Sequence, residues 1–372
     1  MVISASGRGV AASPALVPRS SSVRALGSRA VPDDGRQDRL ERELVRLLAR
    51  HRPGTGLVAL RREMVPRRSS WSIEDLRLHL SDGSVVHLLW KDLGREAPES
   101  RAHAIKPREV LERRRELWMY SAVLAEIGEG PVCWGSVDDG PRGIHWLFLE
   151  PVRGSPLCEL GGADAWIAAA AWLGRFHARF SGLPPRGSLL LRHGPRLHRW
   201  WYRRALEFAE RAARRGGPES SGARREAVLL GELEPLHRVA VDRVSSTPNT
   251  LLHGEFCPAN VLVTGGEAGR RIVPVDWEMA GVGPPVLDLA ALTSGGWQGR
   301  DRSAFATAYR EARLEAGADC PPLERLLELL DAALLLLAVQ WMGWTGEAWS
   351  PPVELSTDWM QEAVRSASRM RT

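Results

Sequence analysis

Two short apolar runs in the second half of the chain, separated by a glycine-rich segment, constrain the fold more than any other feature. "VLV" at 261–263 and "RIVPV" at 271–275 have the composition of strands, and "TGGEAGR" between them has that of a loop. We therefore expect an antiparallel hairpin. Positions symmetric about Ala268 face each other, which puts Asn260 opposite Asp276 at the open end, with Cα atoms about 4.5 to 5.5 Å apart.

The polar groups at that open end are ligands of the kind that bind a small divalent cation. An amide oxygen and a carboxylate suit Mg²⁺, which is usually held by few protein oxygens together with phosphates. His253, Glu255 and Glu278 occur in the same stretch. A carboxylate at Glu255, in the loop that leads into the hairpin, could accept the proton of a hydroxyl group attacking a phosphate. The alternative is a surface hairpin with solvated polar ends, but five such groups in an apolar neighbourhood favour a functional site.

The length of the chain predicts more than one lobe, because 372 residues exceed what a single hydrophobic core usually supports. Predicted strands dominate the first part and predicted helices the second. We place the boundary near Glu150, which gives an N-lobe at 37–150 and a helical C-lobe at 151–372. The Ser-, Arg- and Pro-rich residues 1–36 are expected to form a disordered tail.

Composition excludes several functional classes. Apolar residues at 44% and charged residues at 26% are typical of a soluble globular protein. The four cysteines show no paired spacing, so we expect neither a zinc site nor disulfides, and a cytoplasmic location. The leucine-rich run at 326–339 carries two acidic residues and predicts a buried helix, not a membrane span. A net charge of +5 without a concentrated basic stretch argues against a nucleic-acid partner, and a monomer or a homodimer is equally compatible.

A second hairpin is predicted in the N-lobe. "IEDLRLHL" and "VVHLLWKDL" flank an Asp-Gly pair at 82–83 that suits a two-residue turn. With that register, Lys91 shares a largely apolar face with Leu76 and Leu78, where a lysine needs an anionic partner. A nucleotide phosphate would serve, and so would a glutamate of the helix predicted at 107–127, which begins at a proline.

Lysine is almost absent from this chain. Of the 50 basic residues only Lys91 and Lys106 are lysines, a bias typical of a GC-rich bacterial genome. The bias makes a surviving lysine informative, although for Lys106 survival by chance is the alternative. The segment "RRSSWS" at 67–72 could lay hydroxyl and backbone N–H groups over phosphates, but it lacks a GxGxxG pattern.

With these residues in place, "HGEFCPANVLV" and "VPVDWEMAGVGPPVLDLA" resemble the HGDxxxxN…D[WF]E…D pattern of the aminoglycoside phosphotransferase and choline kinase-like family. The resemblance covers roughly residues 55–345. It implies an α+β fold of the protein-kinase type, with a small antiparallel-sheet N-lobe and a larger, mainly helical C-lobe. It also implies that ATP, with Mg²⁺, donates its γ-phosphate to a hydroxyl group of a small molecule such as an aminoglycoside, an amino alcohol or a sugar-like acceptor.

The same resemblance implies roles for the residues of the motif. His253 would brace the catalytic loop, and Glu255 would occupy the position of the catalytic base. Asn260 and Asp276 would hold Mg²⁺, and Glu278 would be a second-metal or structural carboxylate. Further downstream, the aspartate of "PPVLDLA" would support the loop. The nucleotide-binding positions implied for the N-lobe and the linker are Lys91, its helix partner Glu116, Ser70, Ser72, Glu150, Pro151 and Val152.

Glu255 departs from the family pattern, in which this position is mostly aspartate. Glutamate places its carboxylate about 1.3 to 1.5 Å further from the backbone. A displacement of that size can cost on the order of 10²-fold in rate if the substrate does not shift to match. The alternative to an active kinase is therefore a catalytically weak, nucleotide-binding pseudokinase or sensor. The intact metal ligands and Lys91 favour an active enzyme.

Other notable side chains have structural interpretations. His177 is predicted to be a packed, hydrogen-bonded core histidine, and Cys257 a small filler inside the catalytic loop. Five tryptophans fall in C-lobe segments where the family builds its acceptor pocket, so they could line it or pack in the core. These are Trp200, Trp201, Trp341, Trp344 and Trp349.

Overall fold

A computed structural model of the chain describes residues 35–65, 70–96, 106, 110–182, 189–215, 220–266, 269–295, 297, 299–344 and 358–371. The chain divides into two compact units, Met1–Arg46 and Leu47–Thr372. The described part of the first unit is the beginning of helix α1 (Arg36–His51), and the second unit contains all the remaining elements. The tail predicted at 1–36 lies outside the described residues, apart from its last two.

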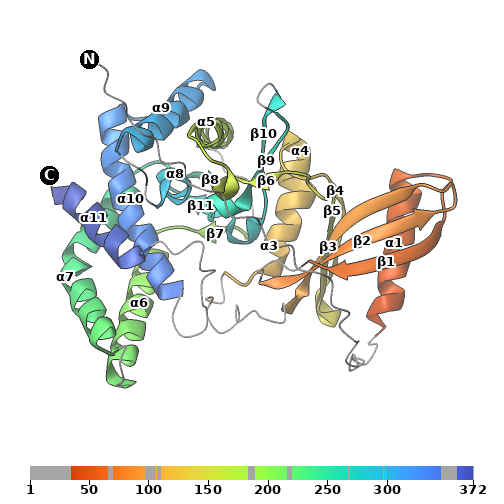
Figure 1. Ribbon diagram of the computed structural model, residues 1–372, viewed down its shortest axis with the longest axis horizontal. Helices are drawn as coiled ribbons and strands as arrows, with labels where there is room; N and C mark the ends of the chain where they lie inside the picture. The colour runs from red at the N-terminus through yellow and green to blue at the C-terminus, as the bar shows by residue number, and fades with distance from the viewer. Residues whose placement is uncertain are drawn as a thin grey trace, which may run out of the picture. The chain divides into compact units, whose positions relative to one another are not determined.

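A five-stranded antiparallel sheet, in the order β1-β2-β3-β5-β4, forms the strand-rich part of the second unit (Figure 1). Strand β3 is the central strand of this sheet and pairs with both β2 and β5. All residues of β5 are buried, as expected for a strand covered on both faces. The strands are β1 (Leu57–Met64), β2 (Trp71–Leu80), β3 (Val85–Glu96), β4 (Cys133–Asp139) and β5 (Ile144–Leu149).

The hairpin of β2 and β3 is present, but its register differs by one residue from the prediction. Leu80 N–H donates to the Ser84 carbonyl oxygen, and Gly83 is left-handed with φ 80°. The loop therefore has three residues instead of two, a common alternative that needs a left-handed residue. A shift of one residue moves every side chain to the other face of the sheet. Lys91 consequently pairs with Ile73 and lies on the face opposite the buried leucines of β2, so the predicted face was wrong.

The helical segment between β3 and β4 begins later than predicted. Glu112 caps it by accepting a hydrogen bond from Arg114 N–H, whereas the predicted proline start lies in 107–109, outside the described residues. The segment ends at Gly128 in the left-handed conformation, as predicted. It consists of α3 (Arg113–Trp118), a π-helical segment (Met119–Leu124) and α4 (Ala125–Ile127).

Helices make up most of the chain after β5. The predicted buried helix at 326–339 lies within α10, a 22-residue helix that is long and apolar enough to cross a membrane by those criteria alone. However, 72% of its most apolar stretch is buried inside the protein, as in a core helix. The helices are α5 (Asp164–Arg179), α6 (Pro195–Arg215), α7 (Ser220–Ser245), α8 (Val286–Thr293), α9 (Gly299–Glu315), α10 (Leu323–Trp344) and α11 (Trp359–Arg371).

Two small sheets interrupt this helical region, in the orders β10-β9-β6 and β7-β11-β8. The loops from β8 to β9 and from β10 to β11 carry the polar residues of the sequence motif. The strands are β6 (Ser155–Pro156), β7 (Leu191–Arg192), β8 (Thr250–Leu252), β9 (Val261–Thr264), β10 (Arg271–Pro274) and β11 (Gly281–Gly283). Short 3₁₀ turns lie at Gly140–Arg142, Leu157–Glu159, Pro258–Asn260 and Trp277–Met279.

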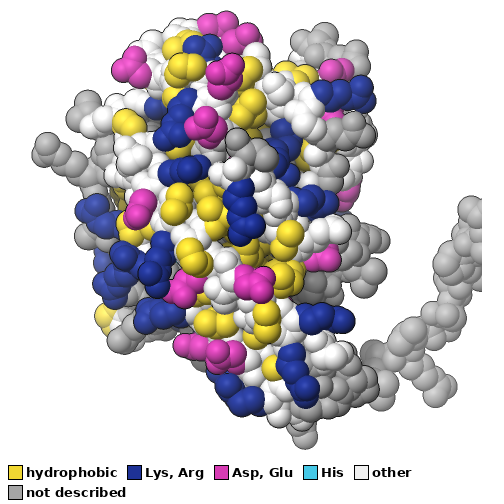
Figure 2. Space-filling model, turned by 90° about the vertical axis from the view of Figure 1, so that its left-hand side faces the viewer, with side chains coloured by type: hydrophobic (Ala, Val, Ile, Leu, Met, Phe, Trp, Pro, Cys, Tyr) yellow, Lys and Arg dark blue, Asp and Glu magenta, His cyan; other side chains and the backbone are white. Residues whose placement is uncertain are grey.

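Basic and acidic side chains are mixed on the face of the molecule that Figure 2 shows. Elsewhere in the described residues, many basic side chains are paired with acidic ones. Asp331, for example, accepts hydrogen bonds from Arg302 at 2.7 Å and from Arg369 at 2.6 Å. Arginines paired in this way contribute little to a basic patch, in keeping with the small net charge.

Candidate active site

The hairpin predicted around Asn260 and Asp276 is present, also with its register moved by one residue. In the pairing of β9 with β10, Val275 N–H donates to the Asn260 carbonyl oxygen at 2.9 Å, so Val275 lies opposite Asn260. Asp276 follows and has φ 67°, the only positive φ among the described non-glycine residues. Such a conformation is costly and is concentrated at functional sites. The two candidate ligands are thus neighbours across the hairpin mouth but not a directly facing pair.

Lys91 lies between two carboxylates. Its Nζ is 2.8 Å from Glu116 Oε1 and 2.7 Å from Asp276 Oδ1. Burial opposes the charge on Lys91, but Asp276 and then Glu116 outweigh it and raise the pKa of the lysine. Burial likewise opposes the charge on Asp276, and Lys91 outweighs it and lowers the pKa of that carboxyl. Strand β3, helix α3 and the loop after β10 therefore meet in one charged cluster, with Glu116 as the helix residue in contact.

The second lysine of the chain lies in the same site, which sequence reasoning did not anticipate. Lys106 Nζ donates to Ser70 Oγ and to Glu278 Oε2, both at 2.6 Å. It also lies 5.0 Å from the centroid of the Trp344 ring. Both lysines of an otherwise lysine-free chain are thus buried against carboxylates of the motif. The scarcity of lysine was the signal that could have identified Lys106.

Helix α3 and the π-helical segment after it hold the loop after β10. Arg115 Nη1 donates to the Glu278 carbonyl oxygen at 2.7 Å, and its Nε donates to the Leu189 carbonyl oxygen at 2.7 Å. Asp276 N–H donates to Tyr120 Oη at 3.1 Å. Arg115 is almost fully buried, so its contacts are structural. Neither Arg115 nor Tyr120 was singled out from the sequence, because an arginine in an arginine-rich chain and a helical tyrosine carry no distinguishing signal.

Asp288 holds the start of the loop between β8 and β9. Its Oδ2 accepts a hydrogen bond from His253 N–H at 2.7 Å, and its Oδ1 accepts one from Gly254 N–H at 2.9 Å. Gly254 has φ 86°, and a Cβ atom there would lie 2.1 Å from the Met279 carbonyl oxygen. Only glycine fits this turn. Asp288, the aspartate of "PPVLDLA", thus contacts the loop backbone directly.

The imidazole of His253 joins the two halves of the motif. Burial lowers the pKa of His253, so the ring is neutral. Its Nε2 lies 3.1 Å from the Val275 carbonyl oxygen, and its Nδ1 accepts a hydrogen bond from Glu255 N–H at 3.3 Å. A neutral ring with the proton on Nε2 satisfies both contacts.

Glu255 and Asn260 lie on the same loop. Burial raises the pKa of Glu255 to about 8, with Lys106 acting in the opposite direction. Asn260 Nδ2 donates to the Glu255 carbonyl oxygen at 3.1 Å. That bond uses the nitrogen of the amide, so the oxygen is the end left to bind a cation.

The donor set fits a magnesium ion that is shared with phosphates. Within the described part of the chain no group of three or more His, Cys, Asp or Glu side chains is arranged to hold a metal by itself. Mg²⁺ commonly needs only one or two carboxylates when phosphate oxygens complete its shell. Asn260 and Asp276 can supply such a partial set.

The sequence of this chain matches the family described as "Phosphotransferase enzyme family" (APH) over residues 106–327, more than half of its length. The chain belongs to this family. Membership confirms the predicted enzyme class, a small-molecule kinase that uses an alcohol group as the phosphate acceptor.

Several solved structures resemble this phosphotransferase over nearly their whole length. The choline kinase from Cryptosporidium parvum Iowa II has a TM-score of 0.55 at 13% identity, covering 89% of this chain and 94% of that one. The Plasmodium vivax ethanolamine kinase has a TM-score of 0.54 at 12% identity, covering 94% and 96%. A microcompartment-associated aminopropanol kinase has a TM-score of 0.53 at 15% identity, covering 84% and 91%. A sequence comparison with curated proteins gave no match.

These likenesses, at low identity, bear on the fold. Together with the family match they confirm the predicted α+β fold of the protein-kinase type, with an antiparallel sheet followed by a mainly helical region.

The remaining positions that the resemblance predicted to bind nucleotide lie near the ends of the sheet strands. The serine-rich loop expected over the phosphates lies partly outside the described residues. Ser72 is buried in β2, where its Oγ lies 3.9 Å from Met64 Sδ, so it is not part of the charged cluster. Glu150 forms two hydrogen bonds with the backbone of Val132, which fix the start of the linker that contains the half-buried Val152.

Four of the five tryptophans of the predicted acceptor region form a linked cluster on α6 and α10. The ring centroids are 4.5 Å apart for Trp200 and Trp201, and 5.3 Å apart for Trp201 and Trp344. Trp341 lies 6.0 Å from Trp344, and Trp349 lies outside the described residues. Trp201 and Trp344 are buried, which indicates core packing, whereas Trp200 and Trp341 are partly exposed.

His177 and Cys257, for which the sequence predicted structural roles, are buried and partly buried, respectively. His177 is fully buried and hydrogen-bonded to Tyr309 Oη at 3.1 Å and to Asp288 Oδ2 at 3.2 Å, as predicted for a core histidine. Burial raises the pKa of the Cys257 thiol to about 12. A thiol with that pKa is unreactive at neutral pH.

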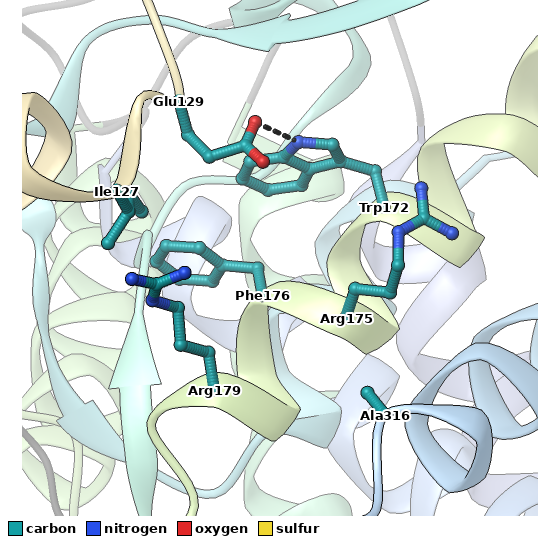
Figure 3. A pocket seen from close by; sticks show the side chains of 7 residues that line it. All are labelled: Ile127, Glu129, Trp172, Arg175, Phe176, Arg179 and Ala316. Atoms are coloured by element: carbon teal, nitrogen blue, oxygen red, sulfur yellow. Dashed lines mark hydrogen bonds between the residues drawn. The ribbon is translucent and has the colours of Figure 1, made fainter.

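Figure 3 shows the side chains that line a cavity of about 330 Å³. None of the predicted site residues lines it. Trp172 in its wall donates a hydrogen bond to Glu129 at 2.8 Å and stacks on Phe256, the residue after the candidate base, with ring centroids 5.6 Å apart. The wall is thus part of the packing that supports the loop between β8 and β9. The cavity is lined by Ile127, Glu129, Trp172, Arg175, Phe176, Arg179 and Ala316.

Proposed function

We propose that this phosphotransferase uses ATP and Mg²⁺ to phosphorylate a hydroxyl group of a small acceptor, with an amino alcohol as the first candidate and an aminoglycoside or sugar-like molecule as the others. The observation that carries the proposal is the position of Lys91, whose ammonium group lies between Glu116 and Asp276. The similarity to structures named as choline, ethanolamine and aminopropanol kinases supports an amino alcohol.

Phosphoryl transfer requires mainly positioning and neutralisation of charge. Lys91 would contact the nucleotide phosphates while Glu116, buried beside it, keeps its side chain in place. Asp276 is 33% exposed and can exchange the ammonium group for a metal ion from solvent. Asp276 and the amide oxygen of Asn260 would hold Mg²⁺, which when bound neutralises charge on the phosphates. Adenine would contact backbone groups of the linker between Glu150 and Val152.

Glu255 would orient the acceptor hydroxyl and accept its proton late in the transfer. With a pKa raised to about 8, the carboxyl is mostly protonated in the free protein at neutral pH. A nearby positive charge favours the ionised form of a carboxyl group, so a cation held by Asn260 and Asp276 would lower the pKa of Glu255. His253 and Asn260 fix the backbone of Glu255 from both sides, which limits how far the longer side chain can move.

The decisive experiment measures ADP production and phosphorylated product with Mg²⁺, ATP and a panel of amino alcohols, aminoglycosides and sugars. The expected result is turnover with at least one hydroxylated amine. The Asp276→Ala protein serves as the control, because it lacks the proposed metal ligand.

A second candidate is a nucleotide sensor with little catalysis, and the raised pKa of Glu255 is the observation that favours it. ATP-dependent thermal stabilisation without ADP production across the whole panel would support the sensor. Such a result would contradict the kinase proposal.

A further inference from the structure

Lys106 is held more firmly than a surface lysine. Its ammonium group donates to Ser70 Oγ and Glu278 Oε2, both at 2.6 Å, and lies over the ring of Trp344. The side chain is 2% exposed. Three anchors in a buried position leave the ammonium group little freedom to move away from Glu278.

The two acidic residues of the "DWE" segment differ in their access to solvent. The side chain of Asp276 is 33% exposed, whereas that of Glu278 is 7% exposed. Arg115 also binds the Glu278 carbonyl oxygen, which fixes the residue from its backbone side. A cation that enters from solvent therefore meets Asp276 first, and it finds Glu278 already neutralised by an internal cation.

We infer that Lys106 takes the place of a second metal ion: its ammonium group occupies Glu278 and limits the site to one divalent cation, held by Asn260 and Asp276. This inference rests on the proposed function and specifies the metal content of that same site. Lys106 is a positioning residue, since it acts on the site through Glu278.

The charges of the cluster explain why one lysine can decide the metal count. The field of Lys106 acts on Glu255 and Asp276 as well as on its direct partner Glu278. Removing one partner of a buried ion pair leaves an uncompensated charge. Without Lys106, the Glu278 carboxylate would be such a charge, and its Oε1 already lacks a hydrogen-bond partner among the described residues. A divalent ion is the available replacement when the lysine is lost.

Counting bound Mn²⁺ tests the inference without measuring activity. The full chain is saturated with a non-hydrolysable ATP analogue, and the number of tightly bound Mn²⁺ ions is measured by electron paramagnetic resonance and by calorimetry. We expect one ion for the wild type and two for Lys106→Met, which removes the charge but keeps the length of the side chain. The matched control is the double variant Lys106→Met with Glu278→Gln, which removes both charges and should return the count to one.

The outcomes separate the inference from the proposed function. Two ions in the wild type, or one ion in a folded Lys106→Met protein, would overturn the role of Lys106 while the kinase proposal stands. No nucleotide-dependent Mn²⁺ binding in the wild type would overturn both. If Lys106→Met does not fold, the Glu278→Gln variant is measured in its place. An Mn²⁺ count and affinity equal to those of the wild type would support the inference. A loss of Mn²⁺ affinity would show that Glu278 is a metal ligand and would overturn it.

Discussion

The ammonium group of Lys91 lies 2.7 Å from the carboxylate of Asp276, although the two residues are 185 positions apart in the sequence. This contact joins the central strand of the antiparallel sheet to the loop that follows β10. It brings the candidate phosphate-binding lysine and the candidate metal ligand into one cluster, with Glu116 as the buried counter-charge.

Asp276→Ala should abolish ATP turnover while the protein stays folded. The carboxylate is the more exposed member of the cluster, so its loss leaves the buried pair of Lys91 and Glu116 intact. We expect kcat to fall by at least about 10²-fold, as when a group that stabilises transition-state charge is removed. A coupled assay for ADP measures the turnover, and circular dichroism shows whether the variant is folded. Normal turnover in the variant would rule out Asp276 as the metal ligand.

Lys91→Met should lower the free energy of unfolding more than the double variant Lys91→Met with Glu116→Gln. The single change leaves the buried Glu116 without its partner, and burial, which already raises the pKa of this carboxyl to about 7, then favours its protonated form. Breaking a buried pair in this way typically costs about 3 to 5 kcal/mol. Neutralising both side chains removes that penalty. Urea denaturation of the wild type, both single variants and the double variant gives the coupling energy. Equal destabilisation by the single and double changes would show that the pair is not coupled.

Glu255→Gln should change how the stability of the nucleotide-free protein depends on pH. In the folded protein the pKa of Glu255 is about 8 instead of the ordinary 4.5, so the folded state binds more protons than the unfolded state between these values. Its contribution to stability is therefore complete below pH 4.5 and is lost as the pH rises to about 8.

Glutamine does not ionise, so the melting temperature of the variant relative to the wild type should increase from pH 5 to pH 8.5. Thermal shift measurements over this range, with equal ionic strength, are sufficient. Parallel curves for the two proteins would mean that the pKa of Glu255 is not raised.

Glu255→Asp tests whether the glutamate is adapted to its acceptor. Aspartate withdraws the carboxylate by about 1.3 to 1.5 Å. If the acceptor pocket matches glutamate, we expect kcat to fall on the order of 10²-fold, because misplacement of about 1 Å can cost that much. Steady-state kinetics with the best acceptor of the panel gives the ratio. An increase in kcat would instead show that glutamate impairs this enzyme.

The sequence alone was enough to predict the elements that carry the site. Alternation of apolar residues and the glycine-rich turns predicted both hairpins, and the sequence motif grouped His253, Glu255, Asn260 and Asp276. These predictions succeed because strand composition, turn residues and short spacings are local properties. The family pattern extended them to the two-lobed fold.

Tertiary structure decided the register of both hairpins and the place of Lys106. A left-handed residue lengthened the β2–β3 loop, and a one-residue slip between β9 and β10 put Val275, not Asp276, opposite Asn260. Spacing in sequence cannot settle such slips, because turn geometry sets the register. Lys106 meets Glu278 across 172 positions, and a buried ion pair of that span arises only when separate elements pack together. Local patterns thus specified the elements, and packing specified which charges face each other.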